Sequence, residues 1–342
     1  MSQPTFMRQE IDEIPQAVAR FLQSSRPALV EAGRLLRDRD PATLVTIARG
    51  SSDHAASFLK YATELTAGVP VASIGPSVMS IYGRQLKLGH CAAIAISQSG
   101  KSPDILAMAQ SARRSGAATI AITNTGDSPL AEAADVTIHL QSGEEKSVAA
   151  TKTFVASVVA GLALLAHWQQ DEGLLAALDA LPDLLQQAIG CDWSPVMGAL
   201  DQHASLYVLG RGPALAIANE AALKFKETCS IHAEAYSAAE VIHGPARIVE
   251  RHFPVLVLAA RDAAEASVAD VAERLAGQGA RVFITSINAH KAERLPFAAS
   301  GNPITDALAL IVSFYGLVEA LSRRRGFDPD RPPYLNKVTQ TV

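Results

Sequence analysis

The sequence predicts an α/β protein with two tandem doubly wound domains, each a parallel sheet between helices, like flavodoxin-like or Rossmann-like αβα sandwiches. Two observations support this prediction. Short apolar strands bounded by turn residues alternate with helical patterns of about ten to twenty residues, as in sheets covered on both faces. In addition, "LVTIARGSSDHAASFLKYATE" near residue 44 is echoed by "LYVLGRGPALAIANEAALKFKE" near residue 206, which indicates two similar halves.

The two halves match at two further places. At the same offset of about 162 positions, "HCAAIAISQSG" falls on "HFPVLVLAARD". With one residue of slip, "RRSGAATIAITN" falls on "LAGQGARVFITS". Each matched pair contains a short apolar strand, so we expect both halves to alternate strand and helix in the same order.

We predict five segments in chain order. They are an N-terminal helical segment (1–40), a first α/β domain (41–170), a helical linker interrupted at Pro182 (171–200), a second α/β domain (201–320) and an irregular C-terminal tail (321–342). The N-terminal segment has apolar residues such as Ile14 and Val18 at helical spacing, and the tail is rich in proline and charge.

The composition is typical of an ordinary soluble protein. The 342 residues are 49% hydrophobic and 19% charged, with a net charge of −4, and the absence of a basic block argues against nucleic-acid binding. Cys91, Cys191 and Cys229 are too scattered for a disulfide framework or a paired metal motif. We find no apolar run near the ~20 residues that span a bilayer and no secretory signal, so we expect a cytoplasmic protein without a membrane partner.

A cluster of hydroxyls lies where a strand gives way to a helix, in "CAAIAISQSGKSPDIL". Ser102 is a good capping residue, and Pro103 suits the first helical position. In open α/β sheets this is where ligands bind, and the helix N-terminus favours an anion. A second strand-to-helix turn, "RGSSDHA", lies in the same half and can converge on the same phosphate. The candidate ligands are Ser51, Ser52, Ser97, Gln98, Ser99 and Ser102.

These neutral donors would wrap a phosphate without adding strong positive charge. The matching loop of the second half, "AARDAAE", lacks the hydroxyls, so we expect one half to keep the anion site and the other to keep only the fold. The alternative is that both serine-rich turns are merely solvent-exposed loops.

The segment "ISQSGKSPDIL" resembles the phosphate loop of the sugar isomerase (SIS) domain family. Further along, "GEEKSVAATKTF", "LGRG…NEAALKFKE", "IHAEAYSAAEVIHGP" and "PPYLNKVTQTV" look like successive motifs of the isomerase half of glucosamine-6-phosphate synthases. Those synthases begin with a glutaminase domain and its N-terminal cysteine, whereas this chain starts Met-Ser. The resemblance therefore implies an enzyme that does not take ammonia from glutamine, similar to the SIS-type glucosamine-6-phosphate deaminases.

Interconversion of an aminoaldose and a ketose needs an acid/base for ring opening, a carboxylate for the carbon proton and a nearby cation. Glu220, Lys224 and Glu227 follow one another at spacings that place them on one helix face. The resemblance implies that Glu227 shuttles the proton with Lys224 beside it, and we include Glu220 as a sugar-binding candidate. From the residues alone, a solvated ion-pair face is the simpler interpretation.

His243, in "VIHGP", is implied by the resemblance to open the sugar ring, often from the neighbouring subunit, which predicts a homodimer with a shared active site. From the residues alone, a histidine beside a turn is more often structural. The nearby His232, Glu234 and Glu240 lack the spacing of a zinc site, so we predict no metal. No cofactor is predicted either.

The resemblance assigns roles to three more residues. Lys337, near the end of the chain, would contact the open-chain carbonyl or form a Schiff base with it. Val148 and Ala150 match positions whose backbone contacts sugar hydroxyls.

The expected function is conversion of glucosamine 6-phosphate to fructose 6-phosphate and ammonia, or the ammonia-dependent reverse. One alternative is a deglycase or deaminase of another 6-phosphosugar amine, which would share the phosphate loop. The other is a non-catalytic phosphosugar sensor. A sensor would not need Glu227, His243 and Lys337 together, and the first ~40 residues hold no evident helix-turn-helix.

Overall fold

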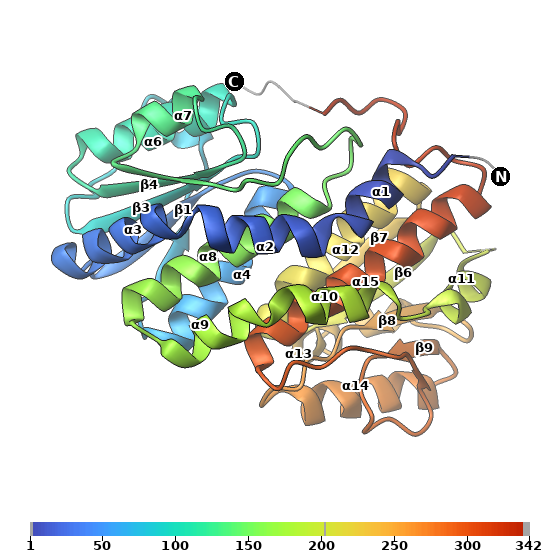
Figure 1. Cartoon of the computed structure of the whole chain (residues 1–342). Helices are drawn as coiled ribbons and strands as arrows, with labels where there is room; N and C mark the ends of the chain where they lie inside the picture. The colour runs from blue at the N-terminus through green and yellow to red at the C-terminus, as the bar shows by residue number, and fades with distance from the viewer. Residues whose placement is uncertain (1–2, 202, 338–342) are drawn as a thin grey trace. The chain divides into compact units, whose positions relative to one another are not determined.

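The computed structural model describes residues 3–201 and 203–337 (Figure 1). Within these residues the strands form two five-stranded sheets with parallel pairing throughout. The first sheet holds β1 (Thr43–Ile47), β2 (Val71–Ser73), β3 (Cys91–Ile96), β4 (Ala118–Thr123) and β5 (Val136–His139). The second holds β6 (Ser205–Gly210), β7 (His232–Ser237), β8 (Pro254–Val257), β9 (Arg281–Ile284) and β10 (Glu293–Arg294).

The two sheets have the same strand order. The first runs β2-β1-β3-β4-β5 and the second, from its other edge, β7-β6-β8-β9-β10. This is the flavodoxin-like order 2-1-3-4-5, whose ligand site lies at the carboxyl ends of its first and third strands. The predicted fold class, two tandem doubly wound sheets, is confirmed.

The chain divides into two compact units that interleave along the sequence. The β1–β5 unit contains residues 16–145, 152–179 and 336–337, and the β6–β10 unit contains residues 3–15, 146–151, 180–201 and 203–335. The units interleave because the first helix of the chain contacts helices of the β6–β10 unit, while the third packs in the β1–β5 unit. The predicted segments, with boundaries at residues 40, 170, 200 and 320, stay a prediction.

In the β1–β5 unit, helices cover both faces of the sheet. One face carries α3 (Arg26–Arg39), α4 (Ser51–Thr66) and α8 (Lys152–Gln169), and the other carries α5 (Ser77–Ser80), α6 (Pro103–Arg114) and α7 (Pro129–Ala133) (Figure 1). The remaining helices are α2 (Ile14–Ser24), which crosses the unit boundary, and α9 (Glu172–Asp179). Strand residues alternate between the faces: Val45 and Ile47 join the core under α6 together with Met108.

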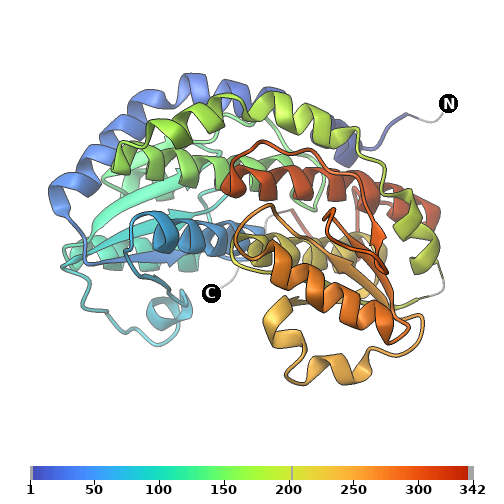
Figure 2. The same cartoon turned by 90° about the horizontal axis from the view of Figure 1, so that it is seen from below.

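The β6–β10 unit is built in the same way. One face packs against α12 (Pro213–Cys229), which in turn packs against α15 (Pro303–Arg324), and the other face packs against α13 (Ala238–Val241) and α14 (Glu265–Gly277). Figure 2 shows α14 in orange and α15 in red on opposite faces of this sheet. The unit also holds α1 (Phe6–Asp12), α10 (Leu181–Ile189), α11 (Ser194–Leu200) and the 3-10 helix η1 (Pro245–Ile248).

The expectation that no apolar run approaches membrane-spanning length is wrong for α15. This helix has 22 residues and is long and apolar enough to cross a bilayer by length and composition, but 83% of its most apolar window is buried inside the protein. It packs along α12 and α10 and carries a buried acid, Asp306. These are features of a core helix, which passes the same test of length and composition.

Candidate functional site

A cavity of about 120 Å³ lies at the carboxyl ends of β1 and β3, where the order of the strands reverses. Its lining consists of Arg49, Ser52, Ile96, Ser97, Gln98, Ser99, Ser102, Ile105 and Lys337. Five of the six serine and glutamine candidates therefore line one cavity, and so does Lys337. Ser51 is not among the lining residues and begins α4. We call this cavity the cradle.

The loop after β3 is shaped so that its hydroxyls can serve a ligand. Ser97 Oγ accepts a hydrogen bond from Gly100 N at 3.2 Å, and Ser99 Oγ accepts one from Lys101 N at 3.3 Å. Because a hydroxyl can accept and donate at once, each retains its own hydrogen as a donor. The loop thus presents oriented donors to an anion.

Gly100 is required by this shape. Its φ is +62°, in the left-handed region, and a Cβ at this position would lie 2.1 Å from Ser128 Oγ. Two backbone hydrogen bonds hold the loop at Gln98 and at Gly100: Asn124 N donates to Gln98 O at 3.0 Å, and Leu130 N donates to Gly100 O at 3.2 Å. The cradle is therefore built on a fixed backbone.

The start of α6 agrees with the prediction in position but not in the role of its cap. The helix begins at Pro103 with Ser102 before it, as expected. The Ser102 hydroxyl makes no capping hydrogen bond, however, and this side chain lines the cradle instead. The first turn of α6 thus adjoins the cavity, and the positive end of the helix dipole favours an anion there.

The cradle is more positively charged than the sequence suggested. Arg49 lines it, and the Nε and Nη2 atoms of Arg49 lie 2.9 and 2.8 Å from Asp104 Oδ2. The Asp104 side chain is completely buried, whereas 49% of the Arg49 side chain is exposed, so the acid fixes the guanidinium at the cavity. Sequence reasoning missed both residues; the signal was the Arg-Gly pair retained in both halves, as Arg49 and Arg211.

Lys337, in the C-terminal tail, lines the same cavity. Its Nζ donates to Glu145 Oε2 at 2.6 Å, and Glu145 is buried. Burial alone would raise the pKa of Glu145, but the charge of Lys337 and hydrogen bonds from Lys337 and Thr153 hold this pKa below its ordinary value. Glu145 is a second buried acid that sequence reasoning did not single out.

In the β6–β10 unit, α12 brings three predicted residues into contact. Lys224 Nζ lies 2.5 Å from Glu227 Oε2 and 3.3 Å from Glu220 Oε1. Glu220 and Lys224 are fully buried, and 20% of the Glu227 side chain is exposed. The alternative of a solvated ion-pair face is therefore wrong.

The three charged groups of this triad differ in their access to solvent. Burial would lower the pKa of Lys224, but the carboxylates of Glu220 and Glu227 outweigh burial, and the pKa is raised. Lys224 thus stays an ammonium, and Glu227 is the triad carboxylate that solvent or a ligand can reach.

The remaining predicted residues also lie in the β6–β10 unit. Val148 N donates to Asp330 O at 3.2 Å, so this N–H already has a partner within the protein. Ala150 follows in the same segment and is partly exposed. His243 lies in the exposed turn after α13, where its backbone N–H donates to Glu240 O at 3.0 Å.

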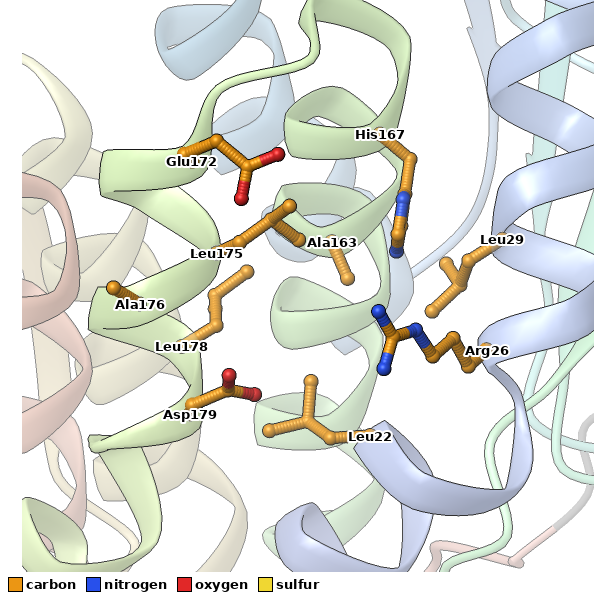
Figure 3. A pocket seen from close by; sticks show the side chains of 10 residues that line it. All are labelled: Leu22, Arg26, Leu29, Ala163, His167, Glu172, Leu175, Ala176, Leu178 and Asp179. Carbon is orange, nitrogen blue, oxygen red and sulfur yellow. The ribbon is translucent and has the colours of Figure 1, made fainter.

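A larger cavity of about 210 Å³ in the β1–β5 unit is less suited to phosphate (Figure 3). Glu172 and Asp179 line it from α9, and both would repel an anion, while Arg26 contributes one positive charge. His167 adds little charge, because burial and the nearby Arg26 and Arg37 lower its pKa. The smaller cradle, with hydroxyl donors and a helix N-terminus, is better suited to an anion.

Comparisons with known proteins identify the family of the chain. The SIS domain family matches residues 36–167 and 199–320. A glutamine–fructose-6-phosphate aminotransferase (isomerizing) from Aeropyrum pernix is 34% identical over 99% of this chain, which spans 57% of that protein. The chain thus spans little more than half the length of the curated relatives it matches.

Solved structures are similar over the whole fold. A candidate phosphosugar isomerase from Silicibacter pomeroyi is 54% identical with a TM-score of 0.93, covering 96% of this chain and 100% of that one. The C-terminal domain of glucosamine-fructose-6-phosphate aminotransferase from Francisella tularensis is 23% identical with a TM-score of 0.84, covering 97% of this chain and 99% of that one. Because the family matches both halves and together these matches exceed half of the sequence, the chain belongs to the SIS domain family.

Proposed function

We propose that this protein is a phosphosugar isomerase of the SIS type that converts glucosamine 6-phosphate and water to fructose 6-phosphate and ammonia, or runs the reverse with free ammonia. The observation that carries the proposal is the cradle, in which hydroxyl donors, Arg49 and Lys337 converge at the ligand position of a doubly wound sheet. The names of the relatives, which refer to fructose 6-phosphate and to phosphosugar isomerases, support the same substrate class.

The proposed reaction begins with ring opening. A proton leaves the O1 hydroxyl, another reaches the ring oxygen, and the bond between C1 and the ring oxygen breaks. We assign this acid/base step to His243, because an imidazole nitrogen can accept a proton from one atom and donate a proton to another. The exposure of His243 is compatible with its use by a second copy of the chain, and the proposal includes a homodimer with a shared site.

Proton transfer between carbons follows. The Glu227 carboxylate takes the proton from C2 of the open-chain sugar while the C1 carbonyl oxygen gains a proton from solvent, which gives an enolamine. Glu227 then returns its proton to C1, and the nitrogen lone pair forms the C2=N bond of an iminium. Water then adds to C2 and ammonia leaves. The Lys224 ammonium, held against Glu227 and Glu220, supplies the positive charge that stabilises negative charge developing on the substrate.

A turnover assay tests the proposal. Pure protein is incubated with glucosamine 6-phosphate, and separately with fructose 6-phosphate and ammonium, while ammonia and hexose phosphates are measured. Ammonia release from glucosamine 6-phosphate is the expected result. Turnover only with another 6-phosphosugar amine would reassign the substrate. Tight phosphosugar binding without any turnover would contradict catalysis and favour a sensor.

A further inference from the structure

We infer that Glu145 is a positioning residue that anchors the C-terminal tail through Lys337 and so holds the Lys337 Nζ atom at the cradle. This inference rests on the proposed function for its chemistry, because it assigns Lys337 to the phosphosugar site. Its geometry belongs to the β1–β5 unit alone, in which both residues lie.

The Glu145 carboxylate is held by Thr153 as well as by Lys337. Thr153 N donates to Oε1 at 3.1 Å, and Thr153 Oγ1 donates to Oε2 at 2.7 Å, both from the first turn of α8. The Glu145 side chain has no exposed surface. The acceptor is therefore rigid and lies at a helix N-terminus, where a negative charge is favoured.

Burial gives this carboxylate a strong requirement for a cation. An ionised carboxylate removed from water is costly unless it is paired and hydrogen-bonded. Lys337, 192 residues further along the chain, meets that requirement at 2.6 Å. Termini are usually poorly ordered, so an ion pair with a buried acid is a specific device for bringing this lysine to a fixed place.

That fixed place is the wall of the cradle. The Lys337 side chain is 24% exposed and lines the cavity with Ser97, Ser99 and Arg49. A tail lysine without an anchor would sample many positions, and the reaction would bear the entropy of ordering it. Glu145 therefore acts on the sugar through Lys337, without having to contact the sugar itself.

The first test is the steady-state kinetics of Glu145→Gln, which keeps the shape of the side chain and removes its charge. We expect kcat to fall by roughly 10- to 100-fold, because Lys337 is misplaced, and KM to change by less than about threefold, because the phosphate donors remain. Glu132→Gln, an exposed acid on α7 of the same unit, is the matched control and should behave as wild type.

A double-variant comparison separates positioning from general damage. If Glu145 acts through Lys337, Glu145→Gln combined with Lys337→Met should be no slower than Lys337→Met alone. Additive losses in the double variant would overturn the inference. Should Glu145→Gln fail to fold, Thr153→Val takes its place, because it removes one hydrogen bond to the carboxylate and keeps the ion pair with Lys337. Thr153→Val should also lower kcat, by a smaller factor than Glu145→Gln.

The second test needs no turnover. Trypsin cleaves after lysine, and the ion pair should protect the bond after Lys337 in the native protein. We expect Glu145→Gln to lose residues 338–342, followed by intact mass, at least about fivefold faster than wild type and Glu132→Gln. Equal cleavage rates would overturn the anchor. Absence of turnover in wild type would instead overturn the proposed function and leave the cleavage result to decide the anchor.

Discussion

At the residue scale, Glu227 and Lys224 share one helix face but differ in their access to solvent. Lys224 lies fully buried between two carboxylates, whereas Glu227 keeps 20% of its side chain exposed. A proton-transferring group must reach its substrate, while its charge partner need not. This difference makes Glu227 the carboxylate of the triad suited to proton transfer.

We therefore expect Glu227→Gln to lower kcat by roughly 100-fold or more while the affinity for fructose 6-phosphate changes little, because the amide cannot take the carbon proton and the cradle is untouched. Steady-state kinetics and calorimetric binding measure the two effects separately. Equal losses of kcat and of affinity would contradict the assigned role.

The ion pair between Glu145 and Lys337 predicts a pH dependence of stability. The pKa of Glu145 is lower in the folded state than in the unfolded state, so the unfolded state takes up its proton first as pH falls below about 4.5. The stabilisation from the ion pair, which is present above this pH, is therefore lost as pH falls through the folded pKa. Urea unfolding at neutral pH should show Glu145→Gln less stable than wild type by ~1–3 kcal/mol. This difference should narrow in acid, and a difference that grows below pH 4.5 would contradict the assignment.

At the element scale, the strand-to-helix turn after β3 lines the cradle and also needs a left-handed backbone at Gly100. Gly100→Ala places a Cβ against Ser128 and requires a left-handed φ, whereas Gly83→Ala requires a similar φ of +60° with no atom within 4 Å. Gly83→Ala should lower the free energy of unfolding by about 1–2 kcal/mol, and Gly100→Ala should lower it by about 1–3 kcal/mol more than that. Only Gly100→Ala should also weaken fructose 6-phosphate binding. Thermal unfolding measures the stability and calorimetry measures the binding. Equal losses of stability in Gly100→Ala and Gly83→Ala would contradict the clash with Ser128.

The elements that the sequence could predict are those with a repeated apolar pattern. The internal echo located β1, β3 and β4 together with β6, β8 and β9, because their strands are buried on both faces. The edge strands β2 and β10 have only three and two residues, too few to carry a pattern. Buried acids such as Glu145 and Asp104 could not be predicted, because composition does not reveal burial and a partner can lie far along the chain.

At the scale of the whole molecule, one architecture appears twice with different side chains at the ligand position. The cradle of the β1–β5 unit has Ser99 where the repeat places Arg261 in the β6–β10 unit. Arg261 Nε donates to Asp306 Oδ2 at 2.7 Å, and its guanidinium lies 3.9 Å from the centre of the Phe297 ring. Both of these partners belong to the same unit as Arg261, and its loop offers none of the serine hydroxyls of the cradle.

This asymmetry predicts one phosphosugar site per chain. Calorimetric titration with fructose 6-phosphate should give one equivalent bound per chain, because only one of the two matched loops carries the donors. Ser97→Ala with Ser99→Ala should weaken that binding by about tenfold, since each lost hydrogen bond contributes roughly 0.5–1.5 kcal/mol. Arg261→Ala, at the matched position of the other unit, is the control and should leave both stoichiometry and affinity unchanged. Two equivalents per chain, or a larger loss of affinity in Arg261→Ala than in the serine variant, would place phosphate recognition in the other unit.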